Sequence, residues 1–453
     1  MNQPTTGISR RTFIKTTAAG IATFAIGRPG FAANSKLQHA CIGVGGMMGW
    51  NDFNNFKDHP KLQIVAICDV DKNHLARAAQ AVPGARQYTD WREMFSKEGW
   101  RIDSVNATVP DHMHAAITMT ALNGRKNVYC QKPLCHDVAE CRAVARAAKA
   151  AGVVTQLGTQ VASTIGDRMA VHWLREGVIG KVTRVLLCSN RSGAEQYRLA
   201  GPRPAQGQPV PASLAWDCWL GTAPVRPFAP SIYHTVNWRA WQDFGTGWSG
   251  DIGCHIFDAV WKGLGLIAPL SVMAEVQKSW QDSPARRADT WPQADHITWV
   301  FPGNAMTAGK ELPVEWFDGA MFVPAELRKL AETDRYPEEG ALVIGTEGAL
   351  LLPHGSGPRL LPSEKFKGHP HPKFEPRNHY HHYVDACLGG PRTESHFMQT
   401  GPMAETILLG TVAIRTPGTL LKWNPTFMSF PNAPQAERYL RRSYRKGWQV
   451  HGL

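Results

Sequence analysis

One lysine in this sequence stands where a strand is expected to end. Residues 128–134 read V-Y-C-Q-K-P-L, so Lys132 closely follows a short apolar run and directly precedes Pro133. Because a residue before proline is biased toward extended backbone, Lys132 is predicted at a strand end and not on a helix face. An ammonium group in that place is a candidate for chemistry. The alternative interpretation is a surface lysine that begins a loop.

An aspartate and a histidine four positions apart form a second candidate group. Asp251 and His255 lie in G-D-I-G-C-H, directly after the glycine-rich stretch 244–250. They share one face of a helix, provided that the helix has begun by Asp251, and a neutral imidazole is available near pH 7 without much tuning. The alternatives are an Asp251 that caps the helix beside a packed His255, or half of a metal site. The nearby histidines match no zinc-protease spacing, so no metal is predicted.

A third group of residues is typical of a nucleotide site. Gly43, Gly45 and Gly46 follow a short apolar run, and Asp69 closes the next one, 26 residues after Gly43. A glycine loop between a strand and a helix lets the backbone approach a pyrophosphate at the helix N-terminus. An acid at the second strand end accepts hydrogen bonds from the adenosine ribose and repels a 2′-phosphate. The expected cofactor is therefore NAD, with NADP less favoured.

The glycine pattern itself is imperfect. Met48 stands at the third fingerprint position, and Gly49 comes one residue late. A structural turn in a fold without nucleotide is the alternative. The cofactor-binding candidates of this region are Gly43, Gly45, Gly46, Met47, Met48 and Asp69.

Alternating strands and helices are expected to position these groups. Four apolar runs, at 39–44, 63–68, 102–108 and 127–130, alternate with amphipathic stretches, some of which are closed by glycine. Strands alternating with helices of this length predict a parallel, doubly wound sheet of the Rossmann class.

The second half of the chain has a different pattern. Longer strand-like runs at 182–189, 271–278 and 295–301 follow without regular helices between them, and 341–353 reads as a hairpin. This pattern predicts an α+β domain with a large, open, mostly antiparallel sheet that covers the cofactor domain. The segments predicted to be surface or subunit contacts are 191–215, 281–293 and the last 30 residues.

The first 33 residues are predicted to be an export signal. Residues 9–15 read S-R-R-T-F-I-K, and a weakly apolar run and a small-residue site at Ala32 follow. This pattern resembles a twin-arginine (Tat) signal, a route that carries proteins already folded. A periplasmic protein with the Tat export machinery as a partner is therefore expected. The alternatives are an uncleaved membrane anchor and a disordered basic start with a chance arginine pair.

Composition limits the remaining classes. The chain has 453 residues, 43% of them hydrophobic, enough for two or three domains with cores of their own. The net charge of +12 comes from scattered basic residues without a nucleic-acid motif, so no nucleic-acid partner is expected. Nine cysteines without a C-x-x-C pair are predicted to be buried thiols.

Several motifs together resemble a known family. Residues 108–114 read T-V-P-D-H-M-H, residues 155–160 read T-Q-L-G-T-Q, and L-K-W-N-P stands at 421–425. With the lysine motif and G-D-I-G-C-H, this set resembles the Gfo/Idh/MocA oxidoreductases, in the exported bacterial branch with an extended C-terminal domain. The resemblance covers nearly all of the chain after the signal.

The resemblance implies a domain division. Residues 34–160 would form a Rossmann NAD-binding domain, 161–425 an α+β substrate and oligomerisation domain, and 426–453 a C-terminal extension behind the 1–33 signal. A homo-oligomer, dimer or tetramer, is expected through the C-terminal sheet.

The resemblance also implies roles for the candidate residues. Lys132 would point at the nicotinamide and the reacting hydroxyl, His255 would be the general acid or base, and Asp251 would orient His255 and contact substrate. The family motif is usually E-K-P, and Gln131 replaces the glutamate, so Lys132 is expected to lose a carboxylate partner. The cofactor contacts implied by the motifs are Thr108, Pro110, His114, Gln131, Lys132 and Gln160.

Substrate contacts are expected just upstream of Gly250 and near residue 379. An aromatic ring there could stack on the apolar face of a sugar, although most of the nearby tryptophans are expected in the core. The stretch 378–382, N-H-Y-H-H, is predicted to start a helix that touches substrate, with a metal cluster as the alternative. The substrate-binding candidates are Lys132, Tyr233, His234, Trp238, Arg239, Asp251, His255 and His379.

The family implies hydride transfer at a carbohydrate hydroxyl. The expected function is an NAD-dependent oxidoreductase acting on a sugar, polyol or glycoside with a tightly held nicotinamide. One alternative is a redox-neutral glycosidase or lyase, in which oxidation and elimination are followed by return of the hydride. Another is a nucleotide-binding protein without catalysis. Since an exported enzyme meets no NAD pool, each cycle is expected to restore the cofactor.

Overall fold

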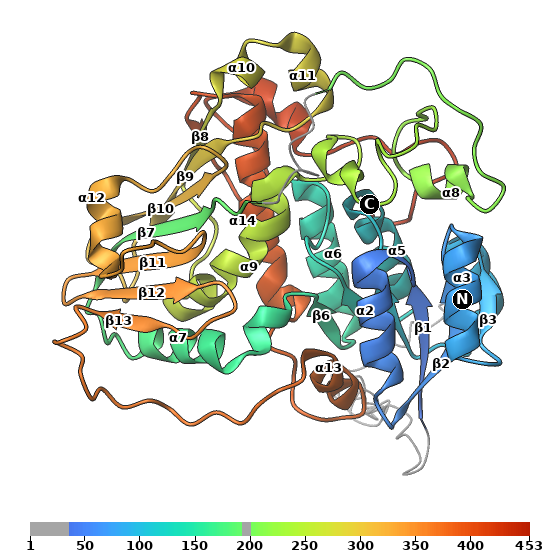
Figure 1. Ribbon diagram of the computed structural model, residues 1–453, viewed down its shortest axis with the longest axis horizontal. Helices are drawn as coiled ribbons and strands as arrows, with labels where there is room; N and C mark the ends of the chain where they lie inside the picture. The colour runs from blue at the N-terminus through green and yellow to red at the C-terminus, as the bar shows by residue number, and fades with distance from the viewer. Residues whose placement is uncertain (1–35, 193–200) are drawn as a thin grey trace, which may run out of the picture. The chain divides into compact units, whose positions relative to one another are not determined.

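The computed structural model describes residues 36–192 and 201–453, and the predicted export signal lies outside these ranges. Within Leu37–Leu453, which forms one compact unit, the chain builds two sheets (Figure 1). The predicted fold class, a parallel Rossmann sheet followed by an α+β half with a mostly antiparallel sheet, is confirmed.

The first sheet has six parallel strands in the order β3-β2-β1-β4-β5-β6. This is the order of the doubly wound dinucleotide-binding fold, which binds ligands where the order reverses, between β1 and β4. The strands are β1 (Leu37–Ile42), β2 (Leu62–Cys68), β3 (Arg86–Tyr88), β4 (Ser104–Ala107), β5 (Asn127–Cys130) and β6 (Thr155–Leu157).

The helices between these strands begin and end where the sequence supplies caps. Asp137 forms a capping box with Glu140 at the start of α6, and Gly152 ends that helix with a φ of 64°. The side chains of Asp71 and Asp90 accept hydrogen bonds from backbone N–H groups in the first turns of α3 and α4. The helices are α2 (Gly46–Lys57), α3 (Lys72–Ala81), α4 (Trp91–Glu98), α5 (Asp111–Asn123) and α6 (Val138–Ala151).

The second sheet has eight strands in the order β13-β12-β11-β7-β10-β9-β8-β14. Neighbouring strands are antiparallel except β7 and β10, which are parallel. The predicted hairpin is confirmed, with Ile344 opposite Ala349. The strands are β7 (Val182–Ser189), β8 (Ser271–Val276), β9 (Asp295–Pro302), β10 (Glu311–Asp318), β11 (Glu339–Gly345), β12 (Ala349–Pro353), β13 (Arg359–Leu361) and β14 (Leu421–Lys422).

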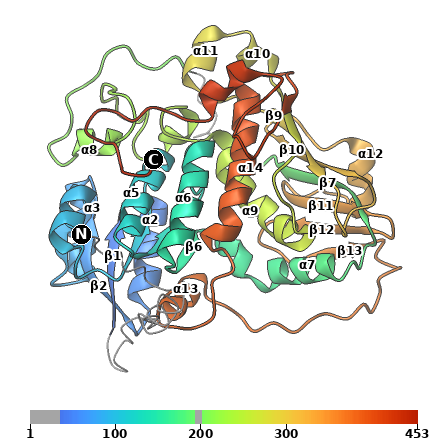
Figure 2. The ribbon, with the colours of Figure 1, turned by 180° about the vertical axis from the view of Figure 1, so that it is seen from behind.

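Long helices pack against this second sheet, so the prediction that no regular helices lie between its strands is wrong. Helices α9 (Gly247–Leu264) and α14 (Phe397–Arg415) contact each other, and α14 also contacts α6. Figure 2 shows α14 running alongside α6. Because nearly every residue of α14 is buried, the helix has no polar face that a periodic pattern could reveal.

Shorter elements complete the described chain. The predicted helix start at 378–382 is present, because the Asn378 side chain accepts the N–H groups of Tyr380 and His381 at the head of α13. The other short elements are η1 (Gln160–Ser163), α7 (Ile165–Arg175), α8 (Trp216–Leu220), η3 (Asn237–Ala240), α10 (Lys278–Gln281), α11 (Pro284–Asp289), α12 (Ala325–Arg328), η4 (Lys329–Ala331), α13 (His379–Cys387) and η5 (Pro434–Tyr439).

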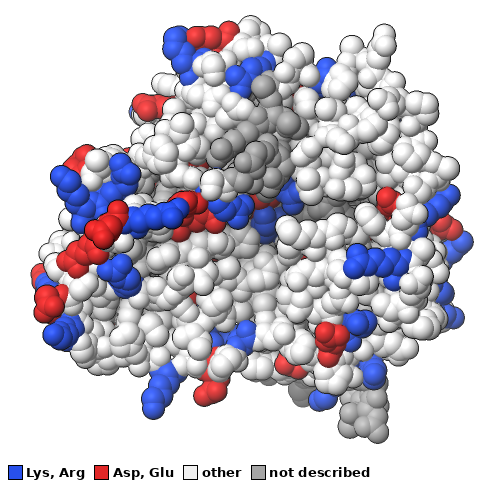
Figure 3. Space-filling model, in the orientation of Figure 1, with Lys and Arg blue, Asp and Glu red and all other residues white. Residues whose placement is uncertain are grey.

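Charges of opposite sign lie next to each other on the face drawn in Figure 3. A mixed acidic and basic band crosses the part of this face where Figure 1 places α12 and the neighbouring strands of the second sheet. Ion pairs of that sheet include Arg184–Glu315 at 2.6 Å and Arg191–Glu339 at 3.7 Å. This face therefore carries paired charges and not one continuous basic field.

Two further properties concern the whole described chain. In residues 36–192 and 201–453, no helix combines the length and apolar character that crossing a membrane would require. All nine cysteines are free thiols, and all but Cys218 are buried.

Candidate active site

Glycines shape the loop between β1 and α2. Gly43 has a φ of +83°, and a Cβ there would lie 1.9 Å from the carbonyl oxygen of Thr108. A Cβ on Gly49 would lie 2.9 Å from the carbonyl oxygen of Gly43, so this glycine lets the first turn of α2 pack against the strand end. Gly49 therefore does the work of the third fingerprint glycine, which the sequence pattern assigned to the position of Met48.

The first residues of α2 form an open cradle. Gly46 has a φ of +61°, and a Cβ there would meet no atom within 4 Å. Met47 is 76% exposed beside it, and Met48 is partly exposed. Free backbone N–H groups at an open helix start are suited to a pyrophosphate, so the residues fit a dinucleotide.

Asp69 lies directly beside this loop. Its Oδ2 accepts hydrogen bonds from the backbone N–H groups of Val44 (3.0 Å) and Gly45 (2.9 Å), and its Oδ1 accepts one from Asp71 N (2.9 Å). His74 Nδ1 lies 3.4 Å from Asp69 Oδ1, and this hydrogen bond raises the pKa of His74. The acid at the end of β2 is thus held at the place where an adenosine ribose would bind.

Lys132 follows the end of β5, where the sequence predicted it. Its Nζ lies 2.8 Å from Asp251 Oδ2, and only 12% of the lysine side chain and 1% of the aspartate side chain are exposed. Arg239 Nε lies 3.6 Å from Asp251 Oδ1. Position 131 offers Lys132 no carboxylate, as the sequence predicts, but Lys132 has a carboxylate partner in Asp251 of α9.

His255 lies one helical turn after Asp251. Helix α9 begins at Gly247, so the two side chains share a face. Burial, with the nearby Lys132 charge, lowers the pKa of His255 well below its usual range. The ring of His354, just after β12, lies 5.3 Å away between centroids. At neutral pH His255 is therefore an uncharged imidazole.

Asp111, at the first position of α5, belongs to the same cluster and was missed from the sequence. Its Oδ2 accepts hydrogen bonds from Thr246 N (3.2 Å) and Thr246 Oγ1 (3.0 Å). Its Oδ1 is buried without a hydrogen-bond partner in the described part of the chain. Burial, with the charge of Asp251, raises the pKa of Asp111 to about 8. The site therefore holds a neutral carboxyl group near an ion pair.

Gln131 bonds to a buried carboxylate on α2. Its Nε2 donates to Asp52 Oδ2 (2.9 Å) and lies 3.1 Å from Oδ1, while its Oε1 accepts the N–H of Lys132 (3.2 Å). Thr108 and Tyr380 also donate to Asp52, at 2.8 and 2.6 Å. Burial raises the pKa of Asp52 to about 6, although these donors oppose the shift. The amide of Gln131 thus links Asp52 of α2, the helix that follows the glycine loop, to the backbone of Lys132.

The remaining residues of the family motifs hold the strand ends together. Pro110 is the N-cap of α5, and the ring nitrogens of His114 lie 2.6 Å from the carbonyl oxygen of Pro133 and 2.7 Å from that of Val109. Gln160 Nε2 donates to the hydroxyls of Tyr129 and Tyr380, both at 3.2 Å.

His379 is deeply placed at the head of α13. Its Nδ1 lies 2.7 Å from Ser163 Oγ, and its Nε2 lies 3.1 Å from the carbonyl oxygen of Leu157. Burial lowers the pKa of His379 to about 3. Both ring nitrogens are used within the protein, so the described contacts of His379 are structural ones.

The substrate candidates upstream of Gly250 lie in two different surroundings. Tyr233 and Trp238 are 1% and 5% exposed in an aromatic cluster, and the Arg239 guanidinium stacks over the Trp238 ring at 4.2 Å. Arg239 thereby reaches Asp251, whereas His234 lies beside Asp71, with 3.9 Å between Nε2 and Oδ2. Of this group, only Arg239 joins the Lys132–Asp251 pair.

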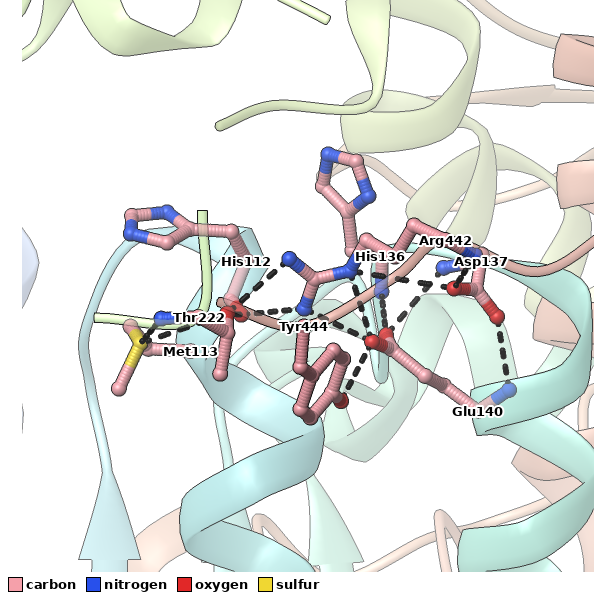
Figure 4. A network of polar contacts seen from close by, with 8 residues as sticks. All are labelled: His112, Met113, His136, Asp137, Glu140, Thr222, Arg442 and Tyr444. Atoms are coloured by element: carbon pink, nitrogen blue, oxygen red, sulfur yellow. Dashed lines mark hydrogen bonds and ion pairs between the residues drawn. The ribbon is translucent and has the colours of Figure 1, made fainter. Parts of the chain in front are cut away.

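The C-terminal tail contacts the start of α6 and the start of α5, the helix that carries Asp111 (Figure 4). Arg442 lies 2.7 Å from Glu140 Oε1 and donates to the carbonyl oxygen of His112 (2.6 Å) and to Thr222 Oγ1 (3.0 Å). Glu140 is part of the α6 capping box, and His112 follows Asp111 in α5. One partly buried arginine therefore connects the tail to the starts of both helices. In the described residues, no group of three or more His, Cys, Asp or Glu side chains could hold a metal ion.

A parallel sheet in the Rossmann order, with a glycine loop and an acid at its switch point, defines a dinucleotide-binding α/β protein. Residues 37–159 match the oxidoreductase family with an NAD-binding Rossmann fold, and residues 168–308 match that family's C-terminal alpha/beta domain. Together these matches cover more than half of the chain. The chain belongs to the Gfo/Idh/MocA oxidoreductase family.

Curated relatives match shorter stretches. D-apiose dehydrogenase of Paraburkholderia graminis is 30% identical over 145 residues, which are 32% of this chain and 38% of that protein. The 2,7-anhydro-N-acetylneuraminate hydratase of Mediterraneibacter gnavus is 30% identical over 111 residues, 24% of this chain and 28% of that protein. In these matches the chain spans well under half the length of each relative.

Solved structures match over a longer range. The WlbA dehydrogenase of Chromobacterium violaceum, solved with NADH and UDP-GlcNAcA, is similar with a TM-score of 0.61. The alignment covers 87% of this chain and 98% of that one, at 14% identity. A likeness at this identity supports the fold alone.

Proposed function

We propose that this protein is an NAD-dependent oxidoreductase that acts on a hydroxyl group of a sugar, polyol or glycoside. The observation that carries this proposal is the buried Lys132–Asp251 pair at 2.8 Å, at the end of β5 in the same sheet as the glycine loop. His255 lies one turn further along α9 and is uncharged at neutral pH. Lys132, paired with Asp251, and the glycine loop thus both lie at the carboxyl ends of strands of the Rossmann sheet, and His255 is the proposed acid or base beside them.

The side chains have separate tasks in this proposal. The bound nicotinamide would supply the hydride acceptor. Lys132 orients the reacting hydroxyl, His255 takes its proton, and Asp251 holds the Lys132 side chain in place. Arg239 faces the other oxygen of Asp251 and is a candidate contact for neighbouring substrate hydroxyls.

The cofactor is proposed to be NAD, since Asp69 lies where the adenosine ribose would bind. Its carboxylate is held by the loop N–H groups of Val44 and Gly45, and its charge disfavours a 2′-phosphate. The carbohydrate class of the substrate is supported by the relatives, among them a D-apiose dehydrogenase.

A redox-neutral reaction is the second candidate function. The neutral carboxyl group of Asp111 in the site favours it, because a departing oxygen needs a proton donor after ring oxidation. One relative that matches part of this chain is named a hydratase and not a dehydrogenase, which also supports this second candidate. The hydride taken in the first step would return in the last, so no net oxidation would occur.

The N-terminal segment and the sheet suggest where and how the protein works. The paired arginine of residues 9–15 supports Tat export to the periplasm, with or without cleavage of the signal. A homo-oligomer, dimer or tetramer, through the C-terminal sheet is part of the proposal, on the basis of the family resemblance.

The test is an assay of the purified protein with free sugars, polyols and p-nitrophenyl glycosides, with and without added NAD. Net NADH formed from a free sugar or polyol supports the first function. Release of p-nitrophenol without net NADH supports the second. Protein that binds NAD yet turns over none of these compounds would favour the alternative of a nucleotide-binding protein without catalysis.

A further inference from the structure

The second half of the chain reaches the adenosine end of the nucleotide site. In the three residues that follow Asp69, two backbone hydrogen bonds join the two halves of the chain. Lys72 N donates to the carbonyl oxygen of Ser213 (2.9 Å), and Ala215 N donates to the carbonyl oxygen of Val70 (2.8 Å). Asp71 and Leu214 form an isolated antiparallel bridge between these two bonds. The segment that leaves β2 is thus paired, residue by residue, with residues 213–215.

This pairing rests on a rigid base. Leu214 belongs to a buried cluster of large apolar side chains between residues 214 and 244, and Val70 packs against that cluster. Within it, Trp216 and Trp219 stack with ring centroids 4.6 Å apart. A segment anchored in this way holds its position, because moving it would expose several aromatic rings to water.

His234 follows Tyr233 of the same cluster and lies near Asp71 and His74, beside Asp69 at the expected ribose position. Its Nε2 lies 3.9 Å from Asp71 Oδ2, and its ring centroid lies 6.3 Å from that of His74, which contacts Asp69. Both ring nitrogens of His234 are buried and have no hydrogen-bond partner in the part of the chain that the structure describes. Buried polar atoms normally have a partner, so these two nitrogens point to a ligand.

The chemistry of that ligand follows from the imidazole. Burial lowers the pKa of His234, which leaves the ring uncharged, with one donor and one acceptor nitrogen. Such a pair matches a ribose hydroxyl or the edge of an adenine. The sequence had placed His234 among the substrate candidates, but its neighbours are Asp71 and His74.

We propose that residues 213–215 and His234 form a strap that completes the adenosine end of the NAD site from the second domain. This proposal rests on the proposed binding of NAD. The strap lies outside residues 37–159, the range that matches the NAD-binding Rossmann fold. Because Asp71 and Lys72 are paired with the strap, the adenosine half cannot leave freely, and the strap slows release of the cofactor.

Two variants separate the parts of the strap. Ala215→Pro removes the N–H that bonds to Val70, and the φ of −80° at this position suits proline. Ala215→Ser keeps the N–H and is its matched control. His234→Ala removes the imidazole, and its control is His451→Ala, at an exposed histidine near the C-terminus.

The measurement is the release rate of NADH, followed by its fluorescence after a chase with excess NAD. Loss of one hydrogen bond is expected to speed release about tenfold in Ala215→Pro and in His234→Ala. The association rate should change little, since affinity changes fall mostly on dissociation. Both controls should keep the wild-type release rate.

The outcomes distinguish this inference from the proposed function. Wild-type protein that binds no NADH would overturn both. Wild-type protein that binds NADH, with unchanged release from both test variants, would overturn the strap alone. If Ala215→Pro fails to fold by thermal melting, His234→Ala and its control decide the result.

Discussion

Lys132 shows how a single residue gains a role from a distant one. Alone, it is an ammonium group at a strand end; with Asp251 of α9 it becomes one half of a buried ion pair at 2.8 Å. Removing one partner of a buried pair leaves the other charge uncompensated, which is costly. Here Arg239 stands 3.6 Å from the same carboxylate and limits that cost. Changes at Lys132 should therefore affect chemistry more than folding.

Substitution of the proposed proton-transfer residues tests their roles. Lys132→Ala and His255→Ala should each lower kcat by on the order of 10² or more, because each removes a group that acts on the reacting proton. Steady-state turnover gives kcat, with whichever sugar, polyol or glycoside the protein is found to accept. NADH titration gives the cofactor affinity, which should stay nearly unchanged. The control is Lys149→Ala at an exposed lysine of α6. Near-native turnover in both variants would exclude these assignments.

Gln131 and Asp52 allow a test by exchange of charge. In the wild type, the raised pKa of Asp52, from 3.8 to about 6, means that its contribution to stability is full below about pH 4 and is lost as the pH rises through 6. Gln131→Glu adds a second buried carboxyl group at about 3 Å. The melting temperature of this variant should therefore fall below that of the wild type, and the gap should widen from pH 5 to pH 8.

A second substitution at Asp52 can compensate for the Gln131→Glu change. Asp52→Asn combined with Gln131→Glu restores one carboxyl and one amide, so the double variant should recover most of the lost melting temperature at pH 8. A Gln131→Glu variant as stable as the wild type at every pH would show that the two groups are not coupled.

At the scale of elements, much of the site could be predicted because its parts follow local rules. A lysine before proline at the end of an apolar run had to end a strand, and Asp251 and His255 had to share a helix face. The caps of α6, Asp137 and Gly152, also act on residues close in sequence. Such signals need no knowledge of the distant chain.

Other elements could not be predicted, because tertiary contacts create them. Helix α14 is buried on nearly all sides, so its sequence lacks the polar face that marks a surface helix. Asp111 looks like an ordinary helix-start acid until Thr246 and Asp251, more than a hundred residues away, bring it into the site. Asp52 gained its role in the same way, from Gln131 and Tyr380.

The C-terminal tail is the element whose removal should be felt most widely. Arg442 is 16% exposed at its side chain and pairs with Glu140 while it bonds to the start of α5. Arg442→Gln should lower the free energy of unfolding by about 3 kcal/mol, because it leaves Glu140 buried with fewer partners. Urea denaturation measures the change, and Arg441→Gln at the exposed neighbour is the control. Equal losses in both variants would contradict the role of Arg442.

At the scale of the whole molecule, the proposed export and the proposed NAD site impose a joint requirement on the cofactor. The proposed Tat export, which is based on the paired arginine of residues 9–15, would follow folding, and beyond the inner membrane there is no NAD pool to exchange with. An exported enzyme of this family must therefore keep its cofactor and restore it in each cycle. A second substrate that takes the hydride would do this, and so would a redox-neutral reaction on one substrate. The strap at Asp71 and Lys72 is a structural reason for slow release.

The most direct test of the central claim is to count the nucleotide that the protein carries. The protein is purified from its own host without added nucleotide and denatured, and the released NAD(H) is quantified per chain. We expect a nearly stoichiometric amount, together with turnover that needs no added NAD. Protein that carries no nucleotide and works only when NAD is supplied at high concentration would contradict the claim.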